Sequence, residues 1–262
     1  MKTLKMFLAG AALLCVSCGR SSQVELTLAG STSIQPFMEM VGEGYTKGHP
    51  GARVVVQGGG STAGIQAVRE GAAAIGMCSR ELNDQEKDLE PIIIARDGIA
   101  VIVHPSNPVA NLTKDQVRDI FAGKVTDWSA VGGAKGKIRP VTREEGSGTR
   151  GAFQELVMHK EKITTEAMVQ DSNGSVREVI ANDPGGIGYM SLGLVNSSVK
   201  AVSIGGVKAT HDNVKNHTYQ LVRPFLLVVK GKPQGAARQF IDYVLSPEGQ
   251  KHLEEEGLIG AK

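Results

Sequence analysis

One short stretch of this 262-residue chain brings together several groups that bind anions. In TREEGSGTRGAF, residues 142–153, an arginine precedes two glutamates and a run of glycines and hydroxyl residues, and a helical pattern then begins. The first turn of a helix has unpaired N–H groups and a positive dipole end, so it attracts anions. Arg143 adds a fork for a tetrahedral oxyanion, and Ser147 and Thr149 add hydroxyl donors beside Gly148. Because a serine in this position often serves only as an N-cap, the stretch alone indicates an anion site without establishing one.

Three further turns place hydroxyl residues ahead of a helical pattern. They lie in LAGSTSIQPFMEM (28–40), VVVQGGGSTAGIQAV (54–68) and IGMCSRELND (75–84). Each follows a short apolar run typical of a strand, and ligands of α/β sheets bind beyond the carboxyl ends of the strands. The sequence therefore predicts that the four turns meet at one anion site. Its candidate ligands are Thr32, Ser33, Ser61, Ser79, Arg80, Arg143, Ser147, Gly148 and Thr149.

The elements that position these turns alternate between strand-like and helix-like patterns. Strands are predicted at residues 25–29, 53–57, 99–103, 138–141 and 226–229. Helices are predicted at residues 33–46, 62–70, 149–159, 176–181 and 238–245. This alternation is typical of an α/β sheet with crossover helices.

Two stretches are predicted to connect two lobes as hinge strands. They are residues 101–112, which contain two prolines, and residues 219–231. Lobe 1 is then expected to comprise 25–104 plus 219–262, with lobe 2, residues 105–218, inserted between its halves.

Composition excludes several classes of protein. Hydrophobic residues make up 41% of the chain and charged residues 21%, which is typical of globular domains. A net charge of +2 and an aromatic fraction of 4% argue against a nucleic-acid partner. His211 and His217 lack the spacing and the carboxylate or thiolate neighbours of a metal site, so no metal or cofactor is expected.

The N-terminus is predicted to be an export signal that spans residues 1–17. Lys2 and Lys5 precede an apolar run that is too short to cross a bilayer. Ser17 then precedes Cys18 in a pattern that resembles the lipobox of bacterial lipoproteins, and residues 18–24 form a polar tether. We therefore expect an exported lipoprotein, periplasmic or at the cell surface, with lipid on Cys18; a simple secreted protein cut nearby is the alternative.

Two other residues, Cys78 and Trp128, are predicted to be mainly structural. Cys78 remains alone in an apolar run, which favours a buried, unreactive thiol. Trp128 has no aromatic partners of a sugar site, which favours a packed turn. Arg150 either reaches the anion or forms a salt bridge with Glu145 or another acidic neighbour.

Seven segments in order resemble the bacterial phosphate-binding proteins that deliver inorganic phosphate to an ABC importer. The segments are GSTSIQP, GGGSTAGIQAV, IGMCSREL, IFAGKVTDWSAVGG, REEGSGTRGAF, GGIGYMSL and RPFLLVVKG, and the resemblance covers the chain after residue 24. It implies the type II periplasmic-binding-protein fold, in which two α/β lobes, each a mixed sheet flanked by helices, are joined by two hinge strands. It also implies a cleft that closes on the anion, an ABC permease as partner, and a membrane contact through lipid alone. We expect a monomer.

The resemblance also implies roles for individual residues. From lobe 1 it implies that the Thr32 hydroxyl and amide, the Ser33 amide and the Ser61 hydroxyl bind the anion. From lobe 2 it implies the Arg143 guanidinium and donors at Ser147, Gly148 and Thr149.

Arg80 marks a departure from the long-chain members of that family. They have an aspartate there that accepts the proton of phosphate and helps to exclude sulfate, whereas SREL here resembles a shorter branch. Glu81 and Glu144 are alternative acceptors. Phosphate is the expected ligand; another tetrahedral oxyanion such as sulfate or molybdate, or a role in sensing or adhesion, is the alternative.

Enzymatic functions match the sequence less well. Gly58, Gly60 and Ala63 have the G-x-G-x-x-A spacing of a dinucleotide-binding loop. An exported lipoprotein meets little nicotinamide cofactor, however, and the resemblance assigns this loop to a free anion. G-x-S-x-G is absent, and no metal cluster or nucleophile for phosphate esters is evident. We therefore expect a binding protein and not an enzyme.

Overall fold

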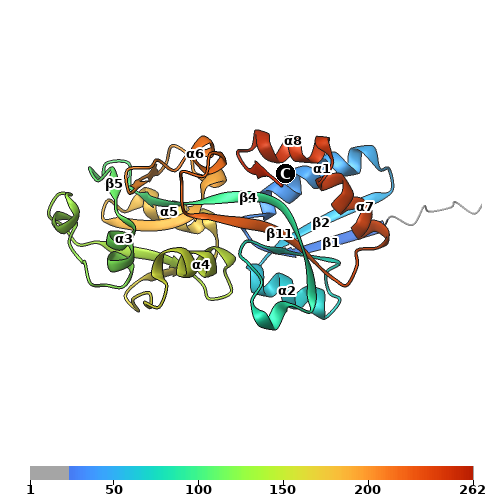
Figure 1. Ribbon diagram of the computed structural model, residues 1–262, viewed down its shortest axis with the longest axis horizontal. Coiled ribbons are helices and arrows are strands. Elements are labelled where there is room, and N and C mark those ends of the chain that lie inside the picture. Colours follow the sequence, from blue (N-terminus) through green and yellow to red (C-terminus); the bar gives the residue numbers. More distant parts are fainter. Residues whose placement is uncertain (1–23, 262) are drawn as a thin grey trace, which may run out of the picture.

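The computed structural model describes residues 24–261, and these residues form two lobes (Figure 1). The lobes lie side by side along the long axis and are connected by β4 (Leu89–Val103) and β11 (Val222–Lys230). No helix in this part of the chain has the length and apolar character needed to cross a membrane. The predicted export signal and the lipid site at Cys18 lie outside the described residues.

Lobe 1 is built on a sheet with helices on both faces. The strands β2 (Ala52–Gly58), β1 (Val24–Gly30) and β3 (Ile75–Cys78) are parallel, and β11 and β4 continue the sheet in antiparallel pairing. The helices are α1 (Gln35–Gly48), α2 (Ser61–Arg69), α7 (Gly235–Val244) and α8 (Pro247–Glu255). In Figure 1, α1, α7 and α8 cover one face and α2 the other, and each group packs on its own buried cluster. A short 3₁₀ turn, Asp84–Glu86, follows β3.

Lobe 2 continues the same sheet from β4. It adds β8 (Gly186–Ser191), β6 (Arg139–Arg143) and β7 (Met168–Gln170), while β9 (Lys200–Ala201) and, from the C-terminus, β12 (Ile259–Gly260) also pair with β4. A separate pair is formed by β5 (Asn111–Leu112) and β10 (Ser203–Ile204). The helices are α3 (Lys114–Phe121), α4 (Gly148–Phe153), α5 (Asn173–Asn182) and α6 (His211–Lys215), with 3₁₀ turns at Trp128–Val131 and Leu192–Leu194. A π-helical turn, Gln154–Met158, extends α4.

The chain passes from lobe 1 to lobe 2 within β4. This strand pairs with β11 as far as Gly98 and with β8 from Ile99 onward. The predicted lobe boundary at residue 104 lies just beyond the end of the same strand. The strand predicted at 99–103 is therefore the second half of β4. The first half escaped the sequence pattern because Glu90, Arg96 and Asp97 interrupt its apolar run.

The cores explain two of the structural assignments. Trp128 is buried in the core of lobe 2, and its Nε1 donates to the Gly185 carbonyl at 3.2 Å, which confirms a packed turn. Cys78 is a free and fully buried thiol, as predicted, and burial raises its pKa. Phe153 and Tyr189 stack with ring centroids 3.9 Å apart, and the Tyr189 hydroxyl accepts from the Arg143 amide at 3.4 Å, which connects this packing to β6.

Candidate oxyanion-binding site

Residues from both lobes meet at the starts of α1, α2, α4 and α5. The Ser33 hydroxyl of lobe 1 lies 2.8 Å from the Thr149 hydroxyl of lobe 2. The Thr62 amide of lobe 1 donates to the Gly146 carbonyl of lobe 2 at 3.1 Å. Asn173 Nδ2 also reaches Ser33 Oγ at 2.9 Å. The cleft between the lobes is therefore closed, and the predicted turns line it.

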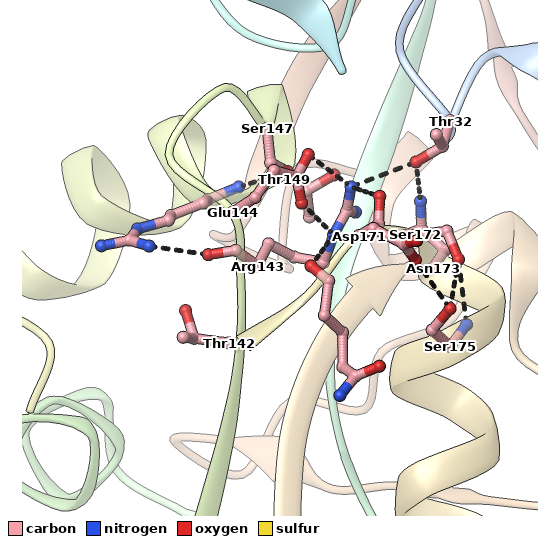
Figure 2. Close-up of polar contacts among 12 residues, drawn as sticks. Thr32, Thr142, Arg143, Glu144, Ser147, Thr149, Asp171, Ser172, Asn173 and Ser175 are labelled. Atoms are coloured by element: carbon pink, nitrogen blue, oxygen red, sulfur yellow. Dashed lines mark hydrogen bonds and ion pairs between the residues drawn. The ribbon is translucent and has the colours of Figure 1, made fainter. Parts of the chain in front are cut away.

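Arg143 is a buried cation at the end of β6. Its Nε donates to the Gln170 carbonyl at 3.2 Å, and its Nη2 donates to the Asp171 carbonyl at 2.9 Å and to Thr32 Oγ1 at 3.2 Å (Figure 2). Glu144 pairs with the same guanidinium at 3.0 Å. Nη1 is buried and has no hydrogen-bond partner among the described residues. A buried donor without a partner costs free energy, and an oxyanion would satisfy it.

A second buried arginine, Arg223, was not predicted. It lies directly opposite Asp97 in the pairing of β11 with β4, and its Nε and Nη2 donate to Asp97 Oδ2 at 3.1 and 2.9 Å. Both side chains are 1% exposed. The same guanidinium donates to Thr149 Oγ1 at 2.7 Å, to Ser33 Oγ at 3.1 Å and to the Ser79 carbonyl at 3.2 Å. Arg223 therefore joins the hinge strands to both sides of the cleft.

Burial and pairing act in opposite directions on this ion pair. Burial raises the pKa of Asp97 and lowers the pKa of Arg223, and the attraction between the two charges opposes both shifts. An isolated buried charge is costly, so each partner requires the other. The sequence carried a signal for the pair: Asp97 interrupts the apolar run IIIARDGIAVIV, and Arg223 interrupts the apolar run LVRPFLLVV.

Asn173 is a further site residue that sequence reasoning missed. It is the first residue of α5, and it is 2% exposed. Its Nδ2 donates to Ser33 Oγ and, at 3.4 Å, to Thr32 Oγ1, while its Oδ1 accepts from the Ser191 amide at 3.1 Å. Figure 2 shows Asn173 and Arg143 approaching Thr32 together. Asparagine at a helix start resembles an ordinary cap, so the sequence alone did not distinguish it.

The serines of lobe 1 form a buried cluster that faces α4. Ser31 Oγ donates to Ser79 Oγ at 2.8 Å, and the Ser79 amide donates to Ser61 Oγ at 3.1 Å. The Ser33 amide, predicted as a ligand donor, donates to Ser31 Oγ at 3.2 Å. A β-carbon on Gly148 would collide with Ser61 Oγ and lie 2.6 Å from Ser79 Oγ. The missing side chain at Gly148 thus lets the two lobes close on each other.

Ser147 is the N-cap of α4, and its role as an anion donor stays a prediction. Its Oγ accepts from the Arg150 amide at 3.2 Å, so it caps α4. The hydroxyl proton is not consumed by this cap, because the cap uses only a lone pair. The Arg150 side chain donates to the Arg143 carbonyl at 2.7 Å and lies 3.5 Å from Glu145, so of the two alternatives for Arg150 the structure shows the salt bridge.

Arg80 directs its guanidinium to Glu86. Its Nη1 and Nη2 donate to Glu86 Oε2 and Oε1 at 2.6 and 2.7 Å, and Asn83 caps the turn that contains Glu86. Burial alone would raise the pKa of Glu86, but the hydrogen bonds from Arg80 and from the Asn83 amide bring it below its usual value. The alkyl part of Arg80 packs against Gly151 of lobe 2, where a β-carbon would lie 2.8 Å from its Cδ. Glu81 is exposed. Arg80 as an anion ligand stays a prediction.

Charge in this region is balanced pair by pair. Three arginines each have a carboxylate partner: Arg143 with Glu144, Arg223 with Asp97, and Arg80 with Glu86. Between residues 24 and 261 no cluster of His, Cys, Asp or Glu has the composition of a metal site. The arrangement offers an anion many directed hydrogen bonds with little net charge.

Comparison with known proteins agrees with this geometry. Residues 18–248 match the model of the PBP superfamily domain. The phosphate-binding protein PstS of Bacillus subtilis is 34% identical over 233 residues, which cover 87% of this chain and 77% of that protein. The chain belongs to this family of phosphate-binding proteins. The resemblance inferred from the seven sequence segments is thereby confirmed.

Solved structures of the phosphate-binding family have the same fold. A structure from Clostridium perfringens, described as a phosphate ABC transporter substrate-binding protein with bound phosphate, has a TM-score of 0.88 and 41% identity. It matches 91% of this chain and 100% of that one. An ABC-type phosphate transport receptor from Vibrio cholerae has a TM-score of 0.76 and 38% identity, matching 89% and 99% of the two chains. The predicted two-lobed α/β fold is therefore confirmed.

Proposed function

We propose that this chain binds inorganic phosphate in the cleft between its lobes and delivers it to an ABC importer. Membership of the phosphate-binding family supports the ligand and the transporter. The observation that carries the proposal is the unpaired, buried Nη1 of Arg143, which is fixed among hydroxyl groups of both lobes. A tetrahedral oxyanion has the charge and the acceptor oxygens to satisfy it.

The predicted ligands fit this proposal unequally. Thr32, Ser33 and Thr149 are linked to one another or to Arg143 by hydrogen bonds, so we propose them as ligands or immediate neighbours of the anion. Ser61, Ser79 and Gly148 form the adjoining contact between the lobes. Ser147, whose proton remains available, completes the donors at the start of α4.

The energetics permit tight binding without a net positive site. A hydrogen bond that involves a charged group contributes about 1.5 to 3 kcal/mol. Micromolar binding requires about 8 kcal/mol, so roughly four such bonds suffice before the costs of ordering the cleft. The buried donors described above provide this number.

Calorimetric titration of the purified protein with phosphate, sulfate and molybdate tests the proposal. We expect one phosphate per chain at micromolar or tighter affinity, and weaker binding of the other two anions. Tighter binding of sulfate or molybdate would show that this anion, and not phosphate, is the ligand. A chromogenic phosphate ester in the same buffer should show no sustained turnover, since the proposed site only binds.

We also propose that the protein is exported and anchored by lipid on Cys18, and that it acts as a monomer. The relatives named above support an extracytoplasmic place for phosphate capture. A Cys18→Ser variant should lose its lipid, which mass spectrometry of the intact protein measures. If wild-type protein from the membrane fraction carries no added mass at Cys18, the anchor is excluded.

A further inference from the structure

Counting protons along the hydroxyls of the cleft identifies two residues that set their direction. We propose that Asn173 and Arg223 are positioning residues that fix the hydroxyls of Thr32 and Thr149 as proton donors to the anion. The inference rests on the proposed function and concerns the protonation state of phosphate that the same site accepts.

The orientation of the Asn173 amide is determined by a backbone group. The Ser191 amide N–H has only a proton to offer, and it lies 3.1 Å from Asn173 Oδ1. That atom is therefore the carbonyl oxygen of the side chain, and the NH₂ group faces the opposite way. Its two protons are directed to Ser33 Oγ at 2.9 Å and Thr32 Oγ1 at 3.4 Å.

Ser33 is then left without a free lone pair. Its oxygen accepts from Asn173 Nδ2 and from Arg223 Nη2 at 3.1 Å. A hydroxyl has two lone pairs and one proton, so Ser33 has only its proton to give. The hydroxyl of Thr149 lies 2.8 Å away. The hydrogen bond between these two residues therefore runs from Ser33 to Thr149.

The same count makes Thr149 and Thr32 donors. Thr149 Oγ1 accepts from Ser33 and from Arg223 Nη1 at 2.7 Å, so both of its lone pairs are occupied. Thr32 Oγ1 faces Asn173 Nδ2 and, at 3.2 Å, Arg143 Nη2, which shares its two protons among Thr32, Glu144 Oε1 and the Asp171 carbonyl. Thr149 therefore retains one proton and no acceptor capacity, and the oxygen of Thr32 faces two donors. Arginine stays protonated and has no acceptor, so neither guanidinium permits the direction to reverse.

This arrangement limits which form of phosphate binds. Fixed donors match bare anion oxygens and repel a P–O–H proton, so monobasic phosphate, with two such protons, finds too few acceptors. Glu144 pairs with the Nε and Nη2 edge of Arg143 and retains free lone pairs, so within this proposal we assign to it the one proton of dibasic phosphate. Arg143 and Arg223 contact these hydroxyls directly. The other charged residues in contact with the two arginines are Glu144, Arg150 and Asp171 at Arg143 and Asp97 at Arg223.

Calorimetry in two buffers of different ionisation enthalpy measures the protons exchanged when inorganic phosphate binds. Below the second ionisation of phosphate, we expect the wild-type protein to release about one proton per anion, because the fixed threonines reject it. Above that ionisation we expect almost no release. Asn173→Ala frees one lone pair on Ser33 and one on Thr32, so the low-pH release should fall to about half while affinity falls about tenfold.

Two further variants make the result decisive. Asn182→Ala removes an exposed asparagine of the same helix, whose side-chain hydrogen bonds within residues 24–261 go to Glu178, and should leave proton release and affinity unchanged. If Asn173→Ala does not fold, Arg223→Lys replaces it in the test. This variant keeps a charge opposite Asp97 but loses the fork, and it should also reduce proton release. Full wild-type release in a folded Asn173→Ala variant with weakened affinity would reduce Asn173 to a purely structural role and overturn the inference. So would a wild-type protein that binds phosphate at low pH without releasing protons. A wild-type protein that binds no phosphate at any pH overturns the proposed function itself.

Discussion

The two lobes present differently prepared helix starts to the cleft. In lobe 1, α1 and α2 begin after Ile34 and Gly60, and neither residue provides a side-chain cap. In lobe 2, α4 and α5 begin after Ser147 and Ser172, and both serine hydroxyls cap the first turn. The helix starts that approach the anion from lobe 1 are thus the uncapped ones.

Helices away from the cleft show that capping is the rule in this chain. Thr113, Thr210 and Ser246 cap α3, α6 and α8, and α7 is the exception among the described helices outside the site. An absent cap leaves amides for water or a ligand. In lobe 1 the first amides have backbone partners in place of caps: the Gln35 amide of α1 donates to the Ser31 carbonyl, and the Thr62 amide of α2 donates to the Gly146 carbonyl of lobe 2. Lobe 2 holds its loop with the serine caps and places the charge of Arg143 on it.

Among substitutions that test this difference between the lobes, Arg143→Ala should cause the largest loss of phosphate binding. The variant removes the buried charge that lobe 2 contributes, and we expect phosphate affinity to fall about 100-fold because charged hydrogen bonds are each worth about 1.5 to 3 kcal/mol. Titration calorimetry measures the loss. Arg139→Ala, which removes an exposed partner of Asp183, is the control and should bind as the wild type does. Unchanged affinity in Arg143→Ala would remove this residue from the site.

A smaller loss, about tenfold, is expected from Gly148→Ala, which blocks the meeting of the two lobes. The added methyl group would occupy the space of Ser61 Oγ and Ser79 Oγ, so the closed form becomes strained while each lobe keeps its own core. Gly146→Ala is the matched control, since its β-carbon would lie 3.7 Å from Thr62. Small-angle scattering with and without phosphate measures closure. Closure equal to that of the wild type would contradict a role for Gly148 in lobe contact.

The smallest effect separates the two roles of Ser147. Ser147→Ala removes the cap of α4 and should lower the free energy of unfolding by about 1 kcal/mol, whereas Ser147→Gly should cost only a few tenths. Both variants lose the hydroxyl proton, so both should weaken phosphate binding by the same several-fold factor, about threefold to tenfold. Thermal unfolding and calorimetry give the two quantities. If binding weakens in parallel with stability, Ser147 is only a cap.

Much of the fold was predictable because its signals are local. The strand at 25–29 and the helix at 62–70 appear in the structure as Val24–Gly30 and Ser61–Arg69, since the alternation of apolar residues is read within a few positions. The hydroxyl-rich turns were predictable for the same reason. The start of β4 was not, because Glu90 and Asp97 obscure a strand that only its pairing with β11 reveals.

The α/β pattern, the four hydroxyl-rich turns and the arginine at the end of β6 could all be predicted from the amino-acid sequence. The contact of Asp97 with Arg223, 126 positions later in the chain, and the contact of Asn173 with Ser33 across the cleft became evident only in the folded molecule. The physical reason is one of range. Helix starts and strand patterns depend on neighbouring residues, whereas the direction of a buried hydroxyl depends on every donor that the fold brings within hydrogen-bond distance.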